Sequence, residues 1–143
     1  MQAVELLLVD DNDTDAELTL LALKRYNPSS QIIRFADGQA TLEYLFQRET
    51  IHKAELRPNP KMILLDLKLV GMSGLDVLRS IKNNPLTHLI PVVIFSSSTQ
   101  AEDIRDCYEL GANSFISKPV QFEEFLETIK NLSYYWLLLN RIP

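Results

Sequence analysis

An uninterrupted apolar run, Met62-Ile63-Leu64-Leu65, ends abruptly in the carboxylate of Asp66. Strands that are buried on both faces have such sequences, so the run predicts a central strand with Asp66 at the point where the chain leaves the core. The arrangement recurs in three further runs: residues 4–9 before Asp10 and Asp11, residues 92–95 before Ser96, and residues 115–117 before Lys118. A chain with several strands of this kind needs a fold that covers both faces of a sheet.

Helical sequences separate the apolar runs. The first follows a cap at Asn12 or Asp13, and another follows Ser73, which forms a capping-box pattern with Asp76. A short strand at residues 32–35 precedes a helix through Phe46, a helix around residues 104–110 ends at Gly111, and a long final helix closes the chain. Strand and helix alternate five times, which predicts an α/β fold with a doubly wound, five-stranded parallel sheet.

The carboxyl ends of parallel strands lie at one edge of a sheet, and ligands of open α/β folds bind there. The side chains expected at this edge are Asp10, Asp11, Asp66, Ser96 and Lys118. Taken singly, each has a structural explanation, because Asp and Ser commonly cap helices and form turns after a strand. Their coincidence at one edge favours a functional site.

Composition limits the class of protein. A length of 143 residues suits one domain spanning residues 1–143, and a net charge of −5 argues against nucleic-acid binding. The single cysteine, Cys107, permits no internal disulfide, and we expect it to fill the core on a helix. The start lacks the features of a secretory signal, and no apolar run approaches the roughly 20 residues of a membrane helix. We therefore expect a cytoplasmic protein that is not associated with membranes.

Three carboxylates in one pocket would repel one another, and a divalent cation is the natural compensation. Hard oxygen ligands with few protein donors suit Mg²⁺. Lys118 offers a positive charge to an anion, and Ser96 offers a hydroxyl donor. Together these groups predict phosphoryl transfer to a carboxylate, in which catalysis consists mostly of positioning and charge neutralisation.

Several motifs as a set resemble the receiver domain of two-component response regulators: Leu8-Val9-Asp10-Asp11, Leu64-Leu65-Asp66, Gly71-Met72-Ser73-Gly74, Pro91-Val92-Val93-Ile94-Phe95-Ser96 and Lys118-Pro119. The resemblance covers nearly the whole chain. It implies a flavodoxin-like (β/α)5 fold with strand order 2-1-3-4-5. It also implies that Asp66 accepts a phosphoryl group from a histidine of a sensor kinase, and that the protein catalyses only its own phosphorylation and dephosphorylation.

The resemblance also assigns roles in the pocket. Asp11, Asp66 and the backbone carbonyl of Lys68 would bind Mg²⁺, and Asp10 would act on the metal through water. Ser96, Lys118 and the backbone amide of Ser97 would hold the phosphoryl oxygens.

Some positions depart from the commonest receiver pattern. Phe115 stands at the aromatic switch position that tyrosine often holds, and Val70 stands where proline is usual. Lys68 and Ser98 flank the path of an attacking water in receivers, so we hypothesise that they set the lifetime of the phosphoryl group.

Two alternatives stay open. The segment that begins at Asp11 resembles a haloacid-dehalogenase phosphatase, which would be Mg²⁺-dependent with Asp11 as its nucleophile, although Asp15 stands where a threonine is expected. The other is a phosphorylation-independent dimeric adaptor of the same fold. A calcium loop is disfavoured because Ala16 replaces the required glycine. His52 and His88 have no expected role.

The final helix carries two patterns. Apolar positions with helical spacing should face the core: Phe122, Phe125, Leu126, Ile129 and Leu132. Residues 134–139 (Tyr-Tyr-Trp-Leu-Leu-Leu) are apolar on every side, which a helix on a monomer surface cannot bury. We expect a homodimer through this helix and its neighbouring strand, with folding back onto the domain as the alternative. No output domain is expected after this helix.

The long polar segment 47–60 and the Tyr-Trp-Leu-rich end of the chain also resemble single-domain response regulators that work with phytochrome-like photoreceptor kinases. This resemblance implies a photoreceptor histidine kinase as the partner.

Overall fold

The computed structural model describes residues 3–47 and 58–143. Parts of the segment 47–60, and His52, therefore lie outside the described residues. Strands and helices alternate in the order β1 (Leu6–Val9), α1 (Asp13–Tyr26), β2 (Ile32–Phe35), α2 (Gly38–Phe46), β3 (Met62–Leu65), α3 (Gly74–Lys82), β4 (Val92–Ser96), α4 (Ala101–Glu109), β5 (Ser114–Ser117) and α5 (Phe122–Ser133), followed by the π-helical segment η3 (Tyr134–Leu139).

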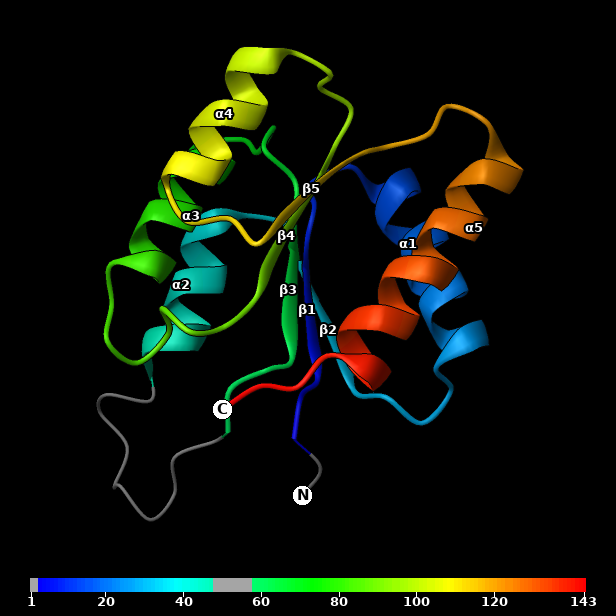
Figure 1. Cartoon of the computed structure of the whole chain (residues 1–143), viewed down its shortest axis with the longest axis horizontal. Coiled ribbons are helices and arrows are strands. Elements are labelled where there is room, and N and C mark those ends of the chain that lie inside the picture. Colours follow the sequence, from blue (N-terminus) through cyan, green and yellow to red (C-terminus); the bar gives the residue numbers. More distant parts are fainter. Residues whose placement is uncertain (1–2, 48–57) are drawn as a thin grey trace.

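All the strand pairs are parallel, and the sheet has the order β2-β1-β3-β4-β5. The predicted doubly wound sheet and its strand order are confirmed. Helices α2, α3 and α4 cover one face, and α1 and α5 cover the other (Figure 1). The three central strands are fully buried, whereas β2 and β5 at the edges are half-buried. This burial explains the continuous apolar sequences of β1, β3 and β4.

Local signals fix several helix ends. The Asn12 side chain accepts a hydrogen bond from the Asp15 amide at the start of α1, and the Ser73 hydroxyl accepts one from the Asp76 amide at the start of α3. The predicted caps are confirmed at both places. Hydrogen bonds from Ser73 and Arg79 lower the pKa of the exposed Asp76 carboxyl. Gly111 follows α4 with a φ of 103°, which a residue with a side chain rarely adopts.

The core splits into two layers because successive residues of a strand face opposite sides of the sheet. Leu7, Val9, Ile63 and Leu65 face the layer under α2, α3 and α4, and Cys107 of α4 is fully buried there, as expected. The pKa of this thiol rises to about 11, mainly because burial disfavours the thiolate.

The other layer lies under α1 and α5. Phe125, Ile129 and Leu132 of α5 are buried in it, and Leu126 packs against it, as predicted. Phe122 was predicted to face the core, and this prediction is wrong because its side chain is 60% exposed. Phe122 is the first residue of α5, and there it lines a surface hollow with Val120 instead.

The end of the chain is divided between burial and exposure. In η3, Leu137 is buried and Trp136 packs against the layer under α1 and α5, so the segment partly folds back onto its own domain. The backbone amide of Asn140 donates to the carbonyl of Tyr135, five residues earlier, and Lys61 donates to the carbonyl of Leu137. Four large apolar side chains of η3 remain about half exposed: Tyr134, Tyr135, Leu138 and Leu139.

Candidate functional site

Asp10 and Asp66 directly follow two neighbouring strands, β1 and β3. The Asp66 amide donates to the carbonyl of Val9, so the two strands stay paired up to the point where the carboxylates begin. Only 1% of Asp10 and 7% of Asp66 is exposed. The parallel register therefore places two nearly buried carboxylates side by side at the carboxyl edge of the sheet.

Asp11 completes a group of three carboxylates. Oxygen atoms of Asp10, Asp11 and Asp66 lie within 4.8 Å of one another. The Asp11 carboxylate also accepts a hydrogen bond from the Val70 amide, at 3.1 Å, and Asp66 Oδ1 accepts one from the Lys68 amide, at 3.2 Å. The loop after β3 is thus folded back onto the acids that follow β1.

A glycine makes this folded loop feasible. The Gly74 amide donates to the carbonyl of Leu67, which closes the loop against the start of α3. A Cβ atom at Gly74 would lie 2.3 Å from the Asp66 carbonyl oxygen and 2.5 Å from the Leu67 Cα atom. Because both neighbours are backbone atoms, only glycine fits here without moving Asp66.

Lys118 joins the acids from β5. Its ammonium group donates to Asp10 Oδ2 and Asp66 Oδ2, both at 2.9 Å, and to Asp15 Oδ2 at 3.0 Å. It also lies 5.9 Å from the centre of the Phe95 ring. The lysine amide donates to the carbonyl of Ser96, so the ends of β4 and β5 are joined beside the pocket.

Burial and hydrogen bonding in the pocket shift the pKa values of Asp10 and Lys118. Burial raises the pKa of the Asp10 carboxyl, and the hydrogen bond from Lys118 opposes this rise only in part. For Lys118, burial acts to lower the pKa, but the hydrogen bonds to Asp10 and Asp66 outweigh it and raise the pKa above its ordinary value. The lysine therefore keeps its positive charge at neutral pH.

The oxygen atoms fit a divalent cation. Three carboxylates converge, and Lys118 offers them one positive charge, so the group keeps a net negative charge. Carboxylate oxygens are the ligands that hard divalent ions prefer. The structure brings the carboxylates of the expected metal site together, and the assignment of Asp11, Asp66 and the Lys68 carbonyl as ligands, with Asp10 acting through water, stays a prediction.

Ser96 and Ser98, at the end of β4 and just after it, were also predicted to act in the site, and their hydroxyl groups form hydrogen bonds within the segment from the end of β4 to the start of α4. Ser96 ends β4 fully buried, and its hydroxyl accepts a hydrogen bond from the Ser98 amide. The Ser98 hydroxyl donates to the Asp103 carboxylate, and the Ser98 carbonyl accepts from Ser117. The Ser98 side chain is thus engaged with the start of α4. Its expected effect on phosphoryl lifetime stays a prediction.

Phe115 lies in the middle of β5, half-buried against the layer under α2, α3 and α4. Its backbone amide donates to the hydroxyl of Tyr108 on α4. The Lys68 side chain is exposed in the loop after β3, as is that of Val70. The structure thus places Phe115 on β5, beside α4, and its role as a switch stays a prediction.

Two residues of the site were not predicted. Asp15 contacts Lys118 from the first turn of α1, and Arg34 of β2 donates twice to the Asp10 carbonyl and once to Asp13. Arg34 interrupts an otherwise apolar strand, and this signal is readable in the sequence. Asp15 gave no such signal, because acids in a first helical turn are common for electrostatic reasons alone.

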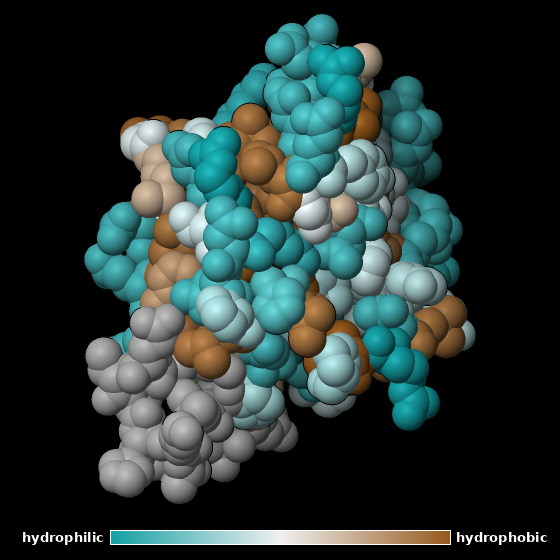
Figure 2. All heavy atoms as spheres, turned by 60° about the vertical axis from the view of Figure 1, so that its left-hand side comes forward, coloured by the Kyte–Doolittle hydropathy of each residue, from teal (hydrophilic) through white to brown (hydrophobic). Residues whose placement is uncertain are grey.

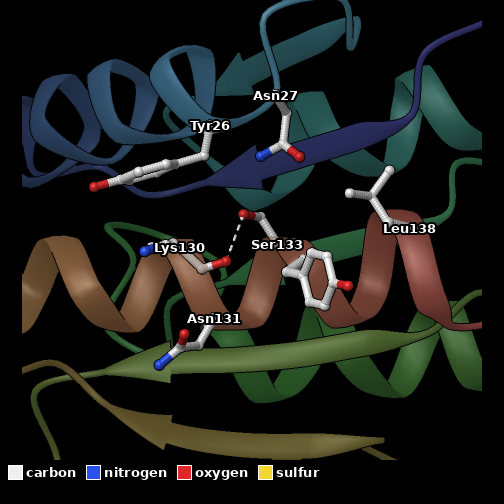
Figure 3. Close-up of a pocket in the computed structure, with 7 residues that line it drawn as sticks. Tyr26, Asn27, Lys130, Asn131, Ser133 and Leu138 are labelled. Carbon is white, nitrogen blue, oxygen red and sulfur yellow. Dashed lines mark hydrogen bonds between the residues drawn. The ribbon is translucent and has the colours of Figure 1, made fainter.

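Apart from this pocket, a hollow of about 300 Å³ lies between the end of α1 and the junction of α5 with η3. Figure 3 shows Tyr26 and Leu138 on opposite sides of it, with the Ser133 hydroxyl donating to the Lys130 carbonyl below. On the side of the molecule formed by α3 and α4, the exposed hydrophobic side chains form only separate small areas (Figure 2).

Comparisons with known proteins agree with this geometry. The sequence profile described as "Response regulator receiver domain" matches residues 6–130. Among curated proteins, a probable methanogenesis regulatory protein, FilR2 of Methanothrix harundinacea, is 38% identical over 96% of this chain and 86% of its own length. The response regulator Rcp1 of Synechocystis is 32% identical over 96% of this chain and 92% of its own length.

Two solved structures are similar over almost their full length. The phosphorylated cyanobacterial phytochrome response regulator RcpA is 30% identical, with a TM-score of 0.87 over 99% of both chains. The Mn²⁺-bound form of Rcp1 is 31% identical, with a TM-score of 0.85 over 98% of this chain and 99% of that one. In the described part of the present chain, no helix is long and apolar enough to cross a membrane.

Proposed function

The chain belongs to the family of response regulator receiver domains, and from this premise we propose that it is a switch that carries a phosphoryl group on Asp66. The observation that supports Asp66 is its pair of contacts. Its carboxylate takes part in the three-acid group and also accepts a hydrogen bond from Lys118. The carboxylates that accept from Lys118 are those of Asp10, Asp15 and Asp66, whereas Asp11 accepts from the Val70 amide, which favours Asp11 as a metal ligand over a nucleophile.

The proposed reaction is a phosphoryl transfer. An oxygen of the Asp66 carboxylate forms a bond to phosphorus, and the P–N bond of a phosphohistidine breaks. The bonding electron pair leaves with the imidazole, which takes up a proton. The signal ends by hydrolysis: water attacks the phosphorus, inorganic phosphate leaves, and the Asp66 carboxylate is restored.

The residues of the pocket would share the work. Lys118 and the hydroxyl of Ser96 would hold the phosphoryl oxygens, together with the amide of Ser97. Asp11, Asp66 and the backbone carbonyl of Lys68 would bind Mg²⁺, with Asp10 acting through water. The cation would supply positive charge that offsets the charge on the transferred group. The Mn²⁺-bound form of Rcp1 supports a divalent ion at this site.

Phosphorylation by a small donor tests the proposal. The protein is incubated with acetyl phosphate and Mg²⁺, and its intact mass is measured. We expect one added phosphoryl group, which Asp66→Asn abolishes. Asp76→Asn is the matched control, because Asp76 is an exposed carboxylate at the start of α3, and it should accept the label normally.

Two outcomes would contradict the proposal. Multiple turnover of an external phosphoester, dependent on Asp11, would favour the phosphatase alternative. A protein that takes no label under these conditions, but still binds a partner through its surface, would favour the phosphorylation-independent adaptor.

We propose a sensor histidine kinase as the phosphoryl donor, and one of phytochrome type in particular. The similarity to RcpA over nearly all of both chains supports this choice. Transfer is measured from phosphorylated kinase cores to wild-type protein and to Asp66→Asn. A phytochrome-type core should transfer at least tenfold faster than a core of another sensory class, and equal rates would remove the preference.

We further propose that the receiver itself carries the output, through a homodimer that uses η3 and its surroundings. Tyr134, Tyr135, Leu138 and Leu139 are 55%, 49%, 62% and 54% exposed, a concentration of apolar surface that a second copy would cover. Light scattering at micromolar concentration tests this proposal. A dimer that Leu138→Glu disrupts is expected, and a monomeric wild type would contradict it.

A further inference from the structure

The ammonium group of Lys118 has three N–H donors and three carboxylate partners. It lies 2.9 Å from Asp10, 2.9 Å from Asp66 and 3.0 Å from Asp15. All the donor capacity of a lysine is therefore in use in this state. If Lys118 is to hold a phosphoryl oxygen, as the proposed function requires, one of these hydrogen bonds must be given up.

The three carboxylates differ in how readily they can lose the lysine. The side chains of Asp10 and Asp66 are 1% and 8% exposed, whereas that of Asp15 is 34% exposed. A buried carboxylate without a partner is costly, while water can replace the lysine at an exposed one. While the phosphoryl donor approaches and Asp66 is still a carboxylate, the bond to Asp15 is thus the least costly of the three to break.

The structure fixes Asp15 where it can act on Lys118. Its amide donates to the Asn12 side chain, and its carbonyl accepts from the Thr19 hydroxyl. Asp15 and Lys118 also line the same surface hollow, of about 370 Å³, together with Ser97. The Asp15 carboxylate is therefore the partner of the lysine that solvent reaches most readily.

Asp13, in the same helical turn, shows what a purely structural role of Asp15 would be. Asp13 and Asp15 are both acids of the first turn of α1, and both stabilise the positive end of the helix dipole. Asp13 pairs with Arg34 and its side chain is 82% exposed. Only Asp15 of the two contacts Lys118, so the pair separates the effect of helix charge from the effect of the contact.

We infer that Asp15 is a positioning residue that holds Lys118 in the unphosphorylated state and is displaced by the phosphoryl group. The inference rests on the proposed function of Asp66. Because the lysine must exchange a carboxylate for a phosphoryl oxygen, Asp15 slows the phosphorylation step. The exchange also frees a negative charge at the wall of the hollow when Asp66 is modified.

The test measures the initial rate of labelling by acetyl phosphate at saturating Mg²⁺ for three variants. The Asp15 end of this ion pair is partly open to solvent, and a solvent-screened pair contributes up to about 1 kcal/mol, so Asp15→Asn should label about three- to fivefold faster than wild type. Asp13→Asn removes the same charge from the same helical turn and should stay within about twofold of wild type. Asp15→Glu restores a carboxylate and should return the rate toward that of wild type. Circular dichroism checks that each variant is folded.

The outcomes separate this inference from the proposed function. A wild type that labels on Asp66, with equal rates for Asp15→Asn and Asp13→Asn, would overturn the role of Asp15 alone. Slower labelling of Asp15→Asn would do the same, since it would mean that Asp15 assists the reaction. A wild type that takes no label would overturn the proposed function and the inference with it.

Discussion

Two lysines at opposite ends of the sheet each donate three hydrogen bonds. Lys118, at the carboxyl edge, donates to three carboxylates. Lys82, at the end of α3, donates to the carbonyls of His88 and Ile90 and to the side-chain oxygen of Asn113, at 3.1, 2.8 and 2.9 Å. The number of bonds is the same, but the partners are anionic at one end and neutral at the other.

The partners decide the chemistry of each amine. Carboxylate hydrogen bonds raise the pKa of Lys118 despite its burial, whereas burial lowers the pKa of Lys82. Lys118 gathers negative groups that can exchange with another anion. Lys82 joins α3 to the segments before β4 and β5, and its three hydrogen-bond acceptors there are neutral oxygens. The comparison teaches that the same side chain serves a reactive site at one end and a structural junction at the other.

The largest expected effect is the loss of the lysine at the reactive end. Lys118→Met should lower the rate of phosphorylation by acetyl phosphate about 10³-fold, because a preorganised charge on the transferred oxygens contributes about 10²- to 10³-fold in comparable sites. Intact-mass labelling measures the rate. Lys82→Met is the control, and a similar loss of labelling in both variants would break the distinction between the two ends.

Two glycines, one against the backbone of Asp66 and one against Lys82, sharpen the comparison further. Gly74→Ala should lower the free energy of unfolding by about 3 kcal/mol, because its Cβ meets the backbone of Asp66 and Leu67. Gly111→Ala should cost only about 1 kcal/mol, since its Cβ meets the flexible side chain of Lys82 and the strain comes from φ alone. Urea denaturation measures both values, and equal losses would contradict the rigid contact at Gly74.

Loss of the lysine at the structural end should affect stability and spare the reaction. Lys82→Met leaves the acceptors of His88, Ile90 and Asn113 without this donor, and we expect a loss of about 2 kcal/mol. Urea denaturation gives the loss, and labelling of Asp66 should stay within about twofold of wild type. An unchanged unfolding midpoint would show that water replaces the amine at no cost.

The smallest expected effect is a pH dependence at Lys82. Its pKa in the folded state lies below its unfolded value, so between the two values the unfolded chain binds more protons. Stability therefore rises with pH in that window. The stability of wild type relative to Lys82→Met should increase as the pH rises toward the unfolded lysine pKa of about 10.4, as measured by urea denaturation. A decrease over this range would mean that the amine is stabilised in its charged form.

Much of the fold could be predicted from the sequence because the central strands have uninterrupted apolar sequences. Continuous apolar runs are typical of strands with both faces covered, and β1, β3 and β4 are such strands, with Asp10 and Asp66 at one edge. The run before Lys118 was interpreted in the same way, but β5 is a half-buried outermost strand of the sheet. The same logic brought Lys118 to that edge. The chemistry of the site followed from the order of the strands.

The failures have physical reasons. Helical periodicity put Phe122 on the core face of α5, but it could not reveal that this first residue of the helix lines a surface hollow. Asp15 has the sequence signature of any acid in a first turn, and only the reach of Lys118 gives it a further meaning. Contacts between side chains from distant elements depend on how deeply each side chain is buried and where it points, and the periodicity of a sequence gives neither.

The placement of Trp136 gives the molecule a built-in optical reporter. It is the only tryptophan of the chain, it stacks edge-on against Tyr135 at 5.0 Å, and it lies on η3 between a buried and an exposed apolar neighbour. Indole emission responds to changes in packing and hydration around the ring. Because the ring belongs to η3 and not to the acidic pocket, any change of its fluorescence on loading Asp66 would register communication across the domain, without a label or a further substitution.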